Sequence, residues 1–259
     1  MAGNDARSLA VFCDFENVAL GVREAKYAQL DMGKVLERLL AKGSIVVKKA
    51  YCDWERYKEF KAAMHSASFE LIEIPHVRQS GKNSADIRMV VDALDLCYTK
   101  AHVDTFVIVS GDSDFSPLVS KLRENNKTVI GVGVKNSSSD LLINNCDEFI
   151  YYDDLVRQDE QKRRAAKKRK ESAPAGQDKK QEAYDLLLGT LEALVAERGA
   201  EEKIWGSMVK QALKRRNPGF NETYYGFRSF SDLLEEAGEK GLIRLDPDEK
   251  SGGYIIRPA

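Results

Sequence analysis

Cysteine and histidine are scarce in this sequence, which has four cysteines and three histidines among 259 residues. The cysteines are widely spaced, and none belongs to a C-x-x-C pair: Cys13, Cys52, Cys97 and Cys146. This spacing indicates neither a zinc ribbon nor a disulfide framework. Each cysteine lies in an apolar or strand-like stretch, so we expect reduced thiols that fill small buried spaces.

Long apolar runs are also missing. No run approaches the ~18 residues that a membrane-spanning helix needs, so an integral membrane protein is not expected. The N-terminal stretch MAGNDARSLAVFCDFEN has no long apolar region before its acidic residues, which argues against a secretory signal and predicts a cytoplasmic protein. Hydrophobic residues make up 43% and charged residues 31%, the composition of a soluble globular chain.

Neither sign of charge is in clear excess, because 40 basic and 41 acidic residues leave a net charge of -1. The distribution is nevertheless uneven. Residues 157–180 contain ten Lys or Arg and four Asp or Glu, a net charge of +6, so the remaining residues carry -7. We therefore expect an acidic body with a basic arm, and the net charge of the whole chain says little about partners.

Short apolar runs alternate with helical patterns between residues 8 and 152. Strands are predicted at 9–15, 44–52, 69–75, 104–111, 127–134 and 148–152, and helices at 31–43, 53–68, 84–101 and 114–126. The strand segments are rich in Val and Ile and lack period-two alternation, as expected for strands buried on both faces. Repeated strand–helix–strand order predicts an α/β fold, a Rossmann-like doubly wound parallel sheet with helices on both sides.

A different pattern follows a basic segment. Residues 158–180 have no aliphatic side chain larger than alanine and are interpreted as linker, into which the preceding helix can continue. Three further helices are predicted at 182–199, 204–220 and 229–241, the last with Ser231 as its cap, before two short β runs. This order is typical of a winged helix-turn-helix. We therefore divide the chain into 1–155, a linker at 156–180 and a second domain at 181–259.

Acidic residues mark three points of the predicted sheet. Asp14 ends the first strand, Asp112 and Asp114 follow the fourth strand, and Asp86 begins the helix after the third strand. In an open α/β sheet the carboxyl ends of the strands border a crevice at the topological switch point. Carboxylates gathered there repel one another unless a divalent cation neutralises them.

Mg²⁺ or Mn²⁺ suits such a set of hard carboxylate ligands. A metal held there can activate water and clamp a phosphate. Asn17 could orient a water or a metal ligand without adding charge, and Ser110 either supports the site through its hydroxyl or starts a turn. The alternative for each single acid is a role as helix cap or turn former.

Three motifs in this region occur together. C-D-F-E-N-V follows the first strand, K-N-S-A-D-I-R-M-V-V-D-A enters a helix, and V-S-G-D-S-D-F-S-P-L follows a central strand. With these motifs in order over about residues 8–155, the chain resembles the NYN domains, LabA-like members of the PIN-type nuclease superfamily. The resemblance implies a PIN-like, metal-dependent ribonuclease fold with sheet order 3-2-1-4-5. It also implies an acidic site at Asp14, Asp86, Asp112 and Asp114, with Asn17 beside it.

Asp92 also matches an acidic position of that family. Six helical residues turn it about 120° away from Asp86, so it would support the site from outside or be structural. Lys82 and Arg88 are candidates for phosphate contacts near the acids, with solvated surface charge as the alternative. A D-x-D motif also occurs in phosphatases of the haloacid dehalogenase type, but there it follows the first strand, where this chain has D-F-E-N.

The segment at 181–259 resembles a LOTUS domain, also called OST-HTH, a winged helix often joined to NYN domains. The resemblance is carried by I-W-G-S-M-V-K-Q-A-L-K-R-R-N-P-G-F-N-E, by F-R-S-F-S-D-L-L-E-E-A and by G-L-I. Basic side chains that could follow RNA phosphates are Arg163, Arg164, Lys167 and Lys168 in the linker, and Lys214, Arg215 and Arg216 in the second domain. A solvated helix face or a protein-docking module is the alternative for the second domain.

These features together predict a metal-dependent ribonuclease with Mg²⁺ or Mn²⁺ as its cofactor. Its predicted partner is single-stranded or structured RNA, with protein partners possible through the C-terminal domain and no membrane. The alternative from a different class is a catalytically weak RNA-binding or regulatory adaptor that uses the same two domains.

Overall fold

The computed structural model describes the chain except for residues 1–6, 28–29, 75–83, 172–177, 200 and 249–252, and it leaves out the side chains of residues 162–171 and 178. The chain divides into two compact units. Met1–Leu36 and Ser44–Lys162 form the first, and Glu37–Gly43 and Arg163–Ala259 form the second. Among the described residues, no helix combines the length and the apolar character needed to cross a bilayer.

A six-stranded parallel sheet organises the first unit. Its strands are β1 (Arg7–Asp14), β2 (Gly43–Cys52), β3 (Glu70–Glu73), β4 (Thr105–Val109), β5 (Thr128–Gly133) and β6 (Glu148–Tyr151). They lie in the order β3-β2-β1-β4-β5-β6. This confirms the predicted α/β fold and its 3-2-1-4-5 order, and the short sixth strand extends the sheet beyond β5.

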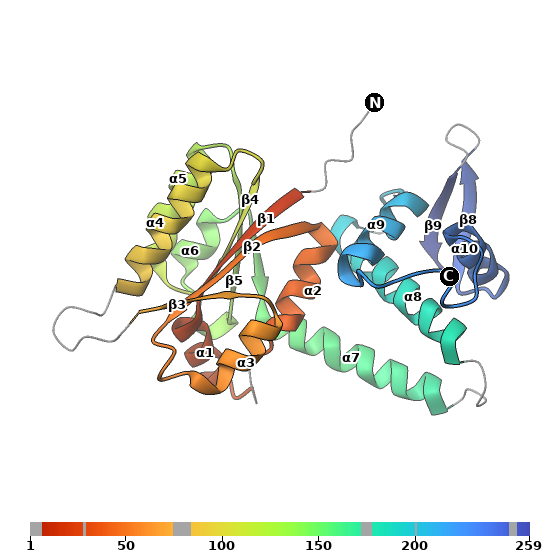
Figure 1. Ribbon diagram of the computed structural model, residues 1–259, viewed down its shortest axis with the longest axis horizontal. Helices are drawn as coiled ribbons and strands as arrows, with labels where there is room; N and C mark the ends of the chain where they lie inside the picture. Colours follow the sequence, from red (N-terminus) through yellow and green to blue (C-terminus); the bar gives the residue numbers. More distant parts are fainter. Residues whose placement is uncertain (1–6, 28–29, 75–83, 172–177, 200, 249–252) are drawn as a thin grey trace. The chain divides into compact units, whose positions relative to one another are not determined.

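Helices cover both faces of this sheet. They are α1 (Phe15–Glu24), α2 (Met32–Lys42), α3 (Lys58–Ser66), α4 (Ser84–Thr99), α5 (Ser116–Glu124) and α6 (Asp140–Asn145), with short 3-10 turns η1 (Ser113–Phe115) and η2 (Lys135–Ser137). Figure 1 shows α4, α5 and α6 on one side of the sheet and α1 and α3 on the other. The helices therefore change from one face of the sheet to the other where the strand order reverses, between β1 and β4. This reversal is the topological switch point of the sheet.

Burial on both faces explains the strand sequences. Residues 9–13 of β1 and 106–109 of β4 are completely buried, so neither strand has a solvent-facing side that would require polar residues. On the side of α4 and α5, Phe12 stacks on Phe106 with ring centroids 6.0 Å apart. Met89 of α4 and Leu118 of α5 belong to the same buried cluster.

The end of β1 differs from the sequence-based expectation. The apolar pattern predicts that the strand includes Phe15, whereas the structure begins α1 at this residue. The ring of Phe15 packs against Trp54 and Phe60, with centroids 5.0 and 5.2 Å away, so its apolar character serves packing between α1 and α3 rather than the sheet. The short helix α6 also lies in a segment for which the sequence predicts no helix.

The segment predicted as a linker is largely helical. α7 (Tyr152–Glu171) continues from the end of β6, and α8 (Asp178–Arg198) is the next helix along the chain. Lys, Arg, Gln, Glu and Ala are good helix formers, so a segment that cannot bury a core can still be a solvated helix. The backbone of the predicted RNA-binding residues Arg163, Arg164, Lys167 and Lys168 belongs to α7, while their side chains lie outside the described part.

From α8 onward, the described part of the second unit has three helices and a small antiparallel sheet. After α8 come β7 (Ile204–Trp205), α9 (Gly206–Arg216), α10 (Phe230–Glu239), β8 (Ile243–Asp248) and β9 (Gly253–Pro258), and the strands lie in the order β7-β9-β8. The predicted helices and terminal hairpin are present, and β7 adds a third strand. Ser229, rather than the predicted Ser231, caps α10, because its hydroxyl accepts a hydrogen bond from the Asp232 amide.

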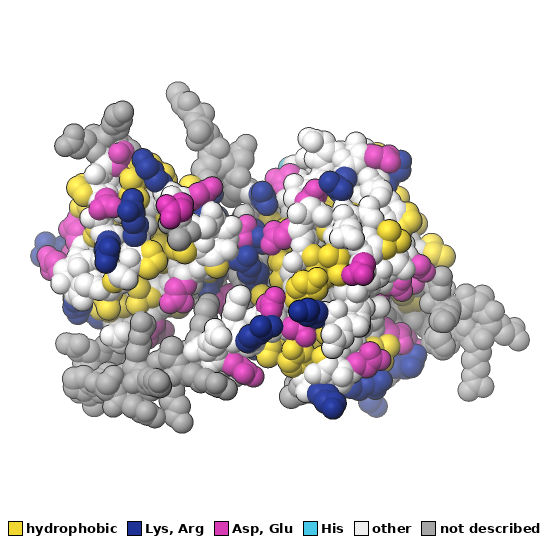
Figure 2. Space-filling view, turned by 180° about the vertical axis from the view of Figure 1, so that it is seen from behind, with side chains coloured by type: hydrophobic (Ala, Val, Ile, Leu, Met, Phe, Trp, Pro, Cys, Tyr) yellow, Lys and Arg dark blue, Asp and Glu magenta, His cyan; other side chains and the backbone are white. Residues whose placement is uncertain are grey.

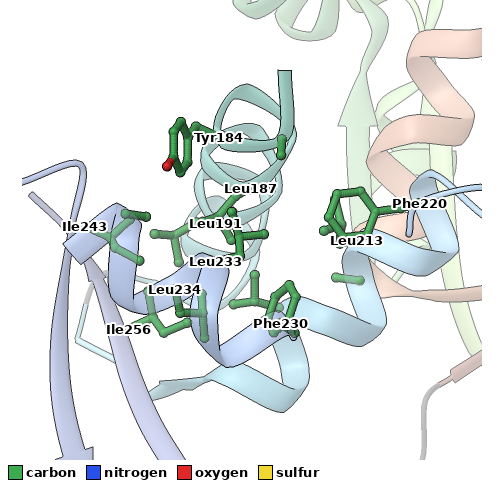
Figure 3. Close-up of a cluster of buried hydrophobic side chains, with 14 of the residues drawn as sticks. Tyr184, Leu187, Leu191, Leu213, Phe220, Phe230, Leu233, Leu234, Ile243 and Ile256 are labelled. Carbon is green, nitrogen blue, oxygen red and sulfur yellow. The ribbon is translucent and has the colours of Figure 1, made fainter. Parts of the chain in front are cut away.

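One buried cluster holds this unit together. Figure 3 shows Leu187 and Leu191 of α8 beside Leu233 and Leu234 of α10, and these side chains belong to a single apolar core. The core extends to Ile256 of β9, so the terminal hairpin is packed onto the helices. Apolar burial of this kind is what stabilises a module of this size.

The cysteines and the surface charges complete the description of the fold. Cys13, Cys52 and Cys97 are buried, Cys146 is partly buried, and all four are free thiols, as expected. On the face that Figure 2 presents, acidic and basic side chains are interspersed in both units. Charges of one sign are therefore not gathered over that face.

Candidate active site at the carboxyl edge of the sheet

Asp14 and Ser110 meet because two central strands end side by side. β1 and β4 pair in parallel with Cys13 opposite Val109, so the residues that follow them are neighbours at the carboxyl edge. The Ser110 hydroxyl donates to Asp14 Oδ2 at 3.0 Å, and both residues are buried. The Ser110 hydroxyl thus contacts the acidic residue directly.

Asn17 ties the loop after β4 to the start of α1. Asp14 Oδ1 accepts from the Asn17 amide at 3.3 Å, and the Asn17 side-chain oxygen accepts from the Gly111 amide at 2.8 Å. A Cβ at position 111 would lie 2.3 Å from the carbonyl oxygen of Ser137, so only glycine allows this loop to pass so closely. In this structure Asn17 therefore positions backbone around Asp14 rather than pointing into solvent.

The acids after β4 also make local capping bonds. Asp112 Oδ1 accepts from the Asp114 amide at 3.0 Å, and the Asp112 amide donates to Ser110 Oγ at 3.2 Å. Asp14 caps α1 in the same way. The capping interpretation of these residues is thus correct for Asp14 and Asp112, and it is compatible with their gathering at one edge, because each carboxylate retains further lone pairs.

The charges of neighbouring acids act on Asp14 and on Asp86. Burial, followed by the carboxylates of Asp86 and Asp112, raises the pKa of Asp14 from its ordinary 3.8 to about 7. Burial and the charges of Asp112 and Asp114 likewise raise the pKa of Asp86. Acids from three distant segments of the chain therefore raise the pKa of Asp14 and of Asp86 at the switch point of the sheet.

Glu16 is a member of this acidic site that the sequence analysis does not select. Its charge is one of the causes that raise the pKa of Asp86, although Glu16 also pairs with Arg56, with Nη1 and Oε1 3.3 Å apart. The sequence feature that could have identified Glu16 is its position in D-F-E-N, two residues after Asp14, which the structure places in the first turn of α1.

Comparison with known proteins identifies the family of this first unit. Residues 8–153 match the NYN domain. The chain belongs to the NYN domain family. NYN domains are part of the PIN-like nuclease superfamily, whose members are usually nucleases. Members of that superfamily typically use divalent metals.

Two relatives of the NYN domain are themselves without an assigned function. The uncharacterized protein MJ0482 of Methanocaldococcus jannaschii is 30% identical over 125 residues, which are 48% of this chain and 49% of that protein. The chain thus spans about half the length of this curated relative. A solved structure, the protein of unknown function VPA0982 from Vibrio parahaemolyticus, is similar with a TM-score of 0.53 and 28% identity. That match covers 60% of this chain and 98% of the Vibrio chain.

Asp92 lies apart from the acidic cluster of the NYN domain. Its carboxylate accepts from the Tyr51 hydroxyl at 2.9 Å and pairs with Lys49 and Arg88 at 3.3 and 3.0 Å. Although burial opposes ionisation, the Tyr51 hydrogen bond and the two cations hold the pKa of Asp92 below its ordinary value. The rotation by about 120° from Asp86 therefore gives Asp92 partners on β2 and on its own helix.

This arrangement predicts a structural role for Asp92. The Asp92→Asn variant should lower the free energy of unfolding by about 1–2 kcal/mol, because Lys49 and Tyr51 lose a charged partner in a half-buried place. Urea denaturation at pH 7 measures this loss. RNA cleavage by the folded variant should remain within about twofold of the wild-type rate, and a variant that folds but no longer cleaves would place Asp92 in the reaction.

The predicted RNA-binding residues differ in their contacts and in their exposure to solvent. Arg88 pairs with Asp92, and Lys82 lies outside the described residues. Arg216 donates to the Gly189 carbonyl at 2.8 Å and to Thr190 Oγ1 at 3.2 Å, so its guanidinium holds α9 to α8. Lys214 is exposed and Arg215 half-buried. Of the three basic residues at the end of α9, Lys214 is therefore the most available to a ligand.

The cluster fits a divalent cation by its donor chemistry. Four aspartates offer hard carboxylate oxygens, the ligands that Mg²⁺ and Mn²⁺ prefer. In the part of the chain that the structure describes, no three His, Cys, Asp or Glu side chains already converge on one point. Binding therefore requires side-chain rotation, which the half-buried Asp86 and Asp112 and the exposed Asp114 permit. A cation would also relieve the repulsion that raises the pKa of Asp14.

Proposed function

We propose that this NYN domain protein is a metal-dependent ribonuclease that cleaves RNA phosphodiesters at Asp14, Asp86, Asp112 and Asp114. The arrangement that carries the proposal is the meeting of Asp14 with the loop after β4 at the paired ends of β1 and β4, where burial and acidic neighbours raise the pKa of Asp14 to about 7. Perturbed acids concentrated at a strand-end crevice are typical of functional sites. Mg²⁺ or Mn²⁺, when bound, would supply an activated water and a Lewis acid for the phosphate.

The residues around the acids contribute positioning. Ser110 orients the buried Asp14 through its hydroxyl, and Asn17 fixes the loop that carries Asp112 and Asp114. Asp86 reaches the same edge from the first turn of α4. The loop after β4 and the two helices thus hold the carboxylates near one another before substrate arrives, which reduces the entropy cost of assembling the site.

A direct assay tests the proposal. The full chain is incubated with single-stranded RNA labelled at either end, in Mg²⁺, in Mn²⁺ or in EDTA. We expect cleavage with metal and none with EDTA, and comparison of the two labels separates internal cleavage from digestion at an end. RNA that is bound but left intact in both metals would contradict the proposal and favour the regulatory adaptor.

We also propose that the second unit is a LOTUS-type winged helix that holds RNA. The order α8, β7, α9, α10, β8 and β9 supports this interpretation, because a winged helix places a terminal hairpin against three helices. The exposed Lys214 on α9 and the basic residues of α7 would contact phosphates, and the carboxylates of the NYN domain would contribute little affinity without metal. Docking of a protein on this unit remains the other outcome of the tests.

The basic half of α7 leads to a prediction about salt. The double variant Lys167→Gln/Lys168→Gln should bind all RNAs more weakly and should flatten the log–log dependence of affinity on salt by about 1.4 units for single-stranded RNA. Fluorescence anisotropy over a salt series measures this slope. The matched control is Lys58→Gln/Lys100→Gln, which removes two exposed charges from the NYN domain and should leave the slope unchanged. Equal slopes for both double variants would disprove a role of α7 in binding.

A further inference from the structure

A groove of about 710 Å³ adjoins the acidic site. It lies between α4 on one side and η1, α5 and α6 on the other, and Asp86 and Asp114 of the acidic cluster are among its lining residues. A ligand whose phosphate is held at the carboxylates would therefore extend into this groove. The volume is in the range of pockets that hold small molecules.

The walls of the groove are unusually apolar for an exposed surface. Ile87 and Val91 lie one turn apart on α4 with 63% and 55% of their surface exposed, and Leu141 of α6 is 58% exposed. Large exposed apolar side chains gathered in one place indicate a surface that is covered in function. The groove residues include no Lys or Arg, and its two charged residues are acids, so it would repel a phosphate.

Polar side chains also line the groove, where the Ser120 hydroxyl donates to the Ser116 carbonyl and the Asn145 side-chain amide to the Leu141 carbonyl. Ser113, Ser120 and Asn145 line it, as does Ser116, which is 5% exposed. The Ser116 hydroxyl has no hydrogen-bond partner among the described residues. Apolar walls with a few polar groups and no cation match a flat uncharged ring with polar edges, which is the chemistry of a nucleobase.

We propose that this groove receives the base of an unpaired nucleotide adjacent to the phosphodiester at the acidic cluster. The inference rests on the proposed nuclease function and specifies its substrate. A paired base is stacked inside its duplex and cannot enter, so the RNA must be single-stranded at the point of cleavage or must flip the nucleotide out. The groove thus selects unpaired RNA by shape, whereas the carboxylates act on a phosphate that every RNA has.

An abasic scan of one RNA tests the groove. The strongest cleavage site of a single-stranded RNA is mapped, and the flanking nucleotides are replaced one at a time by abasic nucleotides. At one position, loss of the base should lower kcat/KM of the full-length protein about tenfold or more. Val91→Ser should cause a similar loss with the intact RNA, and combining the variant with the abasic RNA should add little, because both changes remove the same contact.

Val46→Ser is the matched control. Val46 is 48% exposed on β2 and does not line the groove, so the same chemical change there should leave the rate and its dependence on the base unaltered. Val and Ser have similar helix propensities, so Val91→Ser should keep α4 intact. Circular dichroism and the melting temperature confirm that both variants are folded.

Several results would overturn the inference. Additive losses, or no abasic position that matters, would show that no base occupies the groove. If Val91→Ser instead dissociates a dimer in sedimentation and leaves base dependence unchanged, the groove is an interface between copies. Binding of the same RNAs, measured by fluorescence anisotropy, separates this inference from the proposed function. An RNA whose binding depends on the base and on Val91, but which is never cleaved, would refute the proposed nuclease activity and leave base binding in the groove intact.

Discussion

Replacing Asp112 with asparagine is expected to lower the rate of metal-dependent RNA cleavage by about 10³-fold or more, which corresponds to about 4 kcal/mol in the barrier. Asparagine keeps the side-chain oxygen that accepts from the Asp114 amide, so the turn after β4 should survive. What the variant loses is the negative charge that acts on both Asp14 and Asp86. Cleavage should therefore fail while RNA affinity and the melting temperature remain close to those of the wild type.

Asp95→Asn provides the control for this experiment. Asp95 is exposed on α4, in the same unit and outside the acidic cluster, so its substitution should leave cleavage unchanged. Initial rates with end-labelled RNA in Mn²⁺, measured with separately purified batches, exclude contaminating nucleases. An Asp112→Asn protein that cleaves as fast as Asp95→Asn would remove the carboxylate cluster from the mechanism.

Replacing Asp14 with asparagine is expected to stabilise the metal-free protein at neutral and higher pH. The pKa of Asp14 is about 7 in the folded protein and close to 3.8 in the unfolded chain, so the folded state binds the proton more tightly. Wild-type stability is therefore highest at low pH with respect to this group, and it decreases as the pH rises from about 4 to about 7. The variant, which has no charge at this position, should lack that decrease.

Thermal or urea unfolding in EDTA between pH 4 and pH 8 measures the difference. Asp14→Asn and the wild type should have similar stability near pH 4, and the variant should be more stable by roughly 1–4 kcal/mol at pH 8. Addition of Mg²⁺ at pH 8 should raise the melting temperature of the wild type more than that of the variant, since a cation relieves the same repulsion. A variant that is less stable than the wild type at pH 8 in EDTA would show that Asp14 is not under electrostatic strain.

The architecture of the NYN domain could be predicted from the sequence because its strands are buried on both faces. Continuous apolar runs such as residues 106–109, separated by amphipathic segments, allow few arrangements other than a parallel sheet between helices. The positions of the acids relative to the strand ends then predict that they meet at one edge. The periodicity of α4 likewise predicts that Asp92 faces away from Asp86.

Elements that depend on tertiary packing were harder to predict from the sequence. The sequence pattern at Phe15 fits a strand equally well as a helix, and the contacts with Trp54 and with Phe60 of α3 determine the outcome. A basic segment with no large apolar residue reads as a linker, yet α7 is helical because helix formation needs no buried face when the residues favour it. The cap of α10 falls on Ser229 rather than Ser231, since capping depends on backbone geometry at the helix start.

The sequence by itself determined which acids follow the ends of the strands, because strand segments and helical periodicity are local patterns, and the family resemblance supplied the order of the strands in the sheet. Only the tertiary structure decided what those residues experience. The pKa of Asp14 depends on burial and on Asp86 and Asp112, which are far away in the chain. The groove likewise requires α4 to pack beside α5 and α6, leaving Ile87, Val91 and Leu141 exposed beside the acids. Such properties arise from distances between distant segments, and no local pattern of residues encodes those distances.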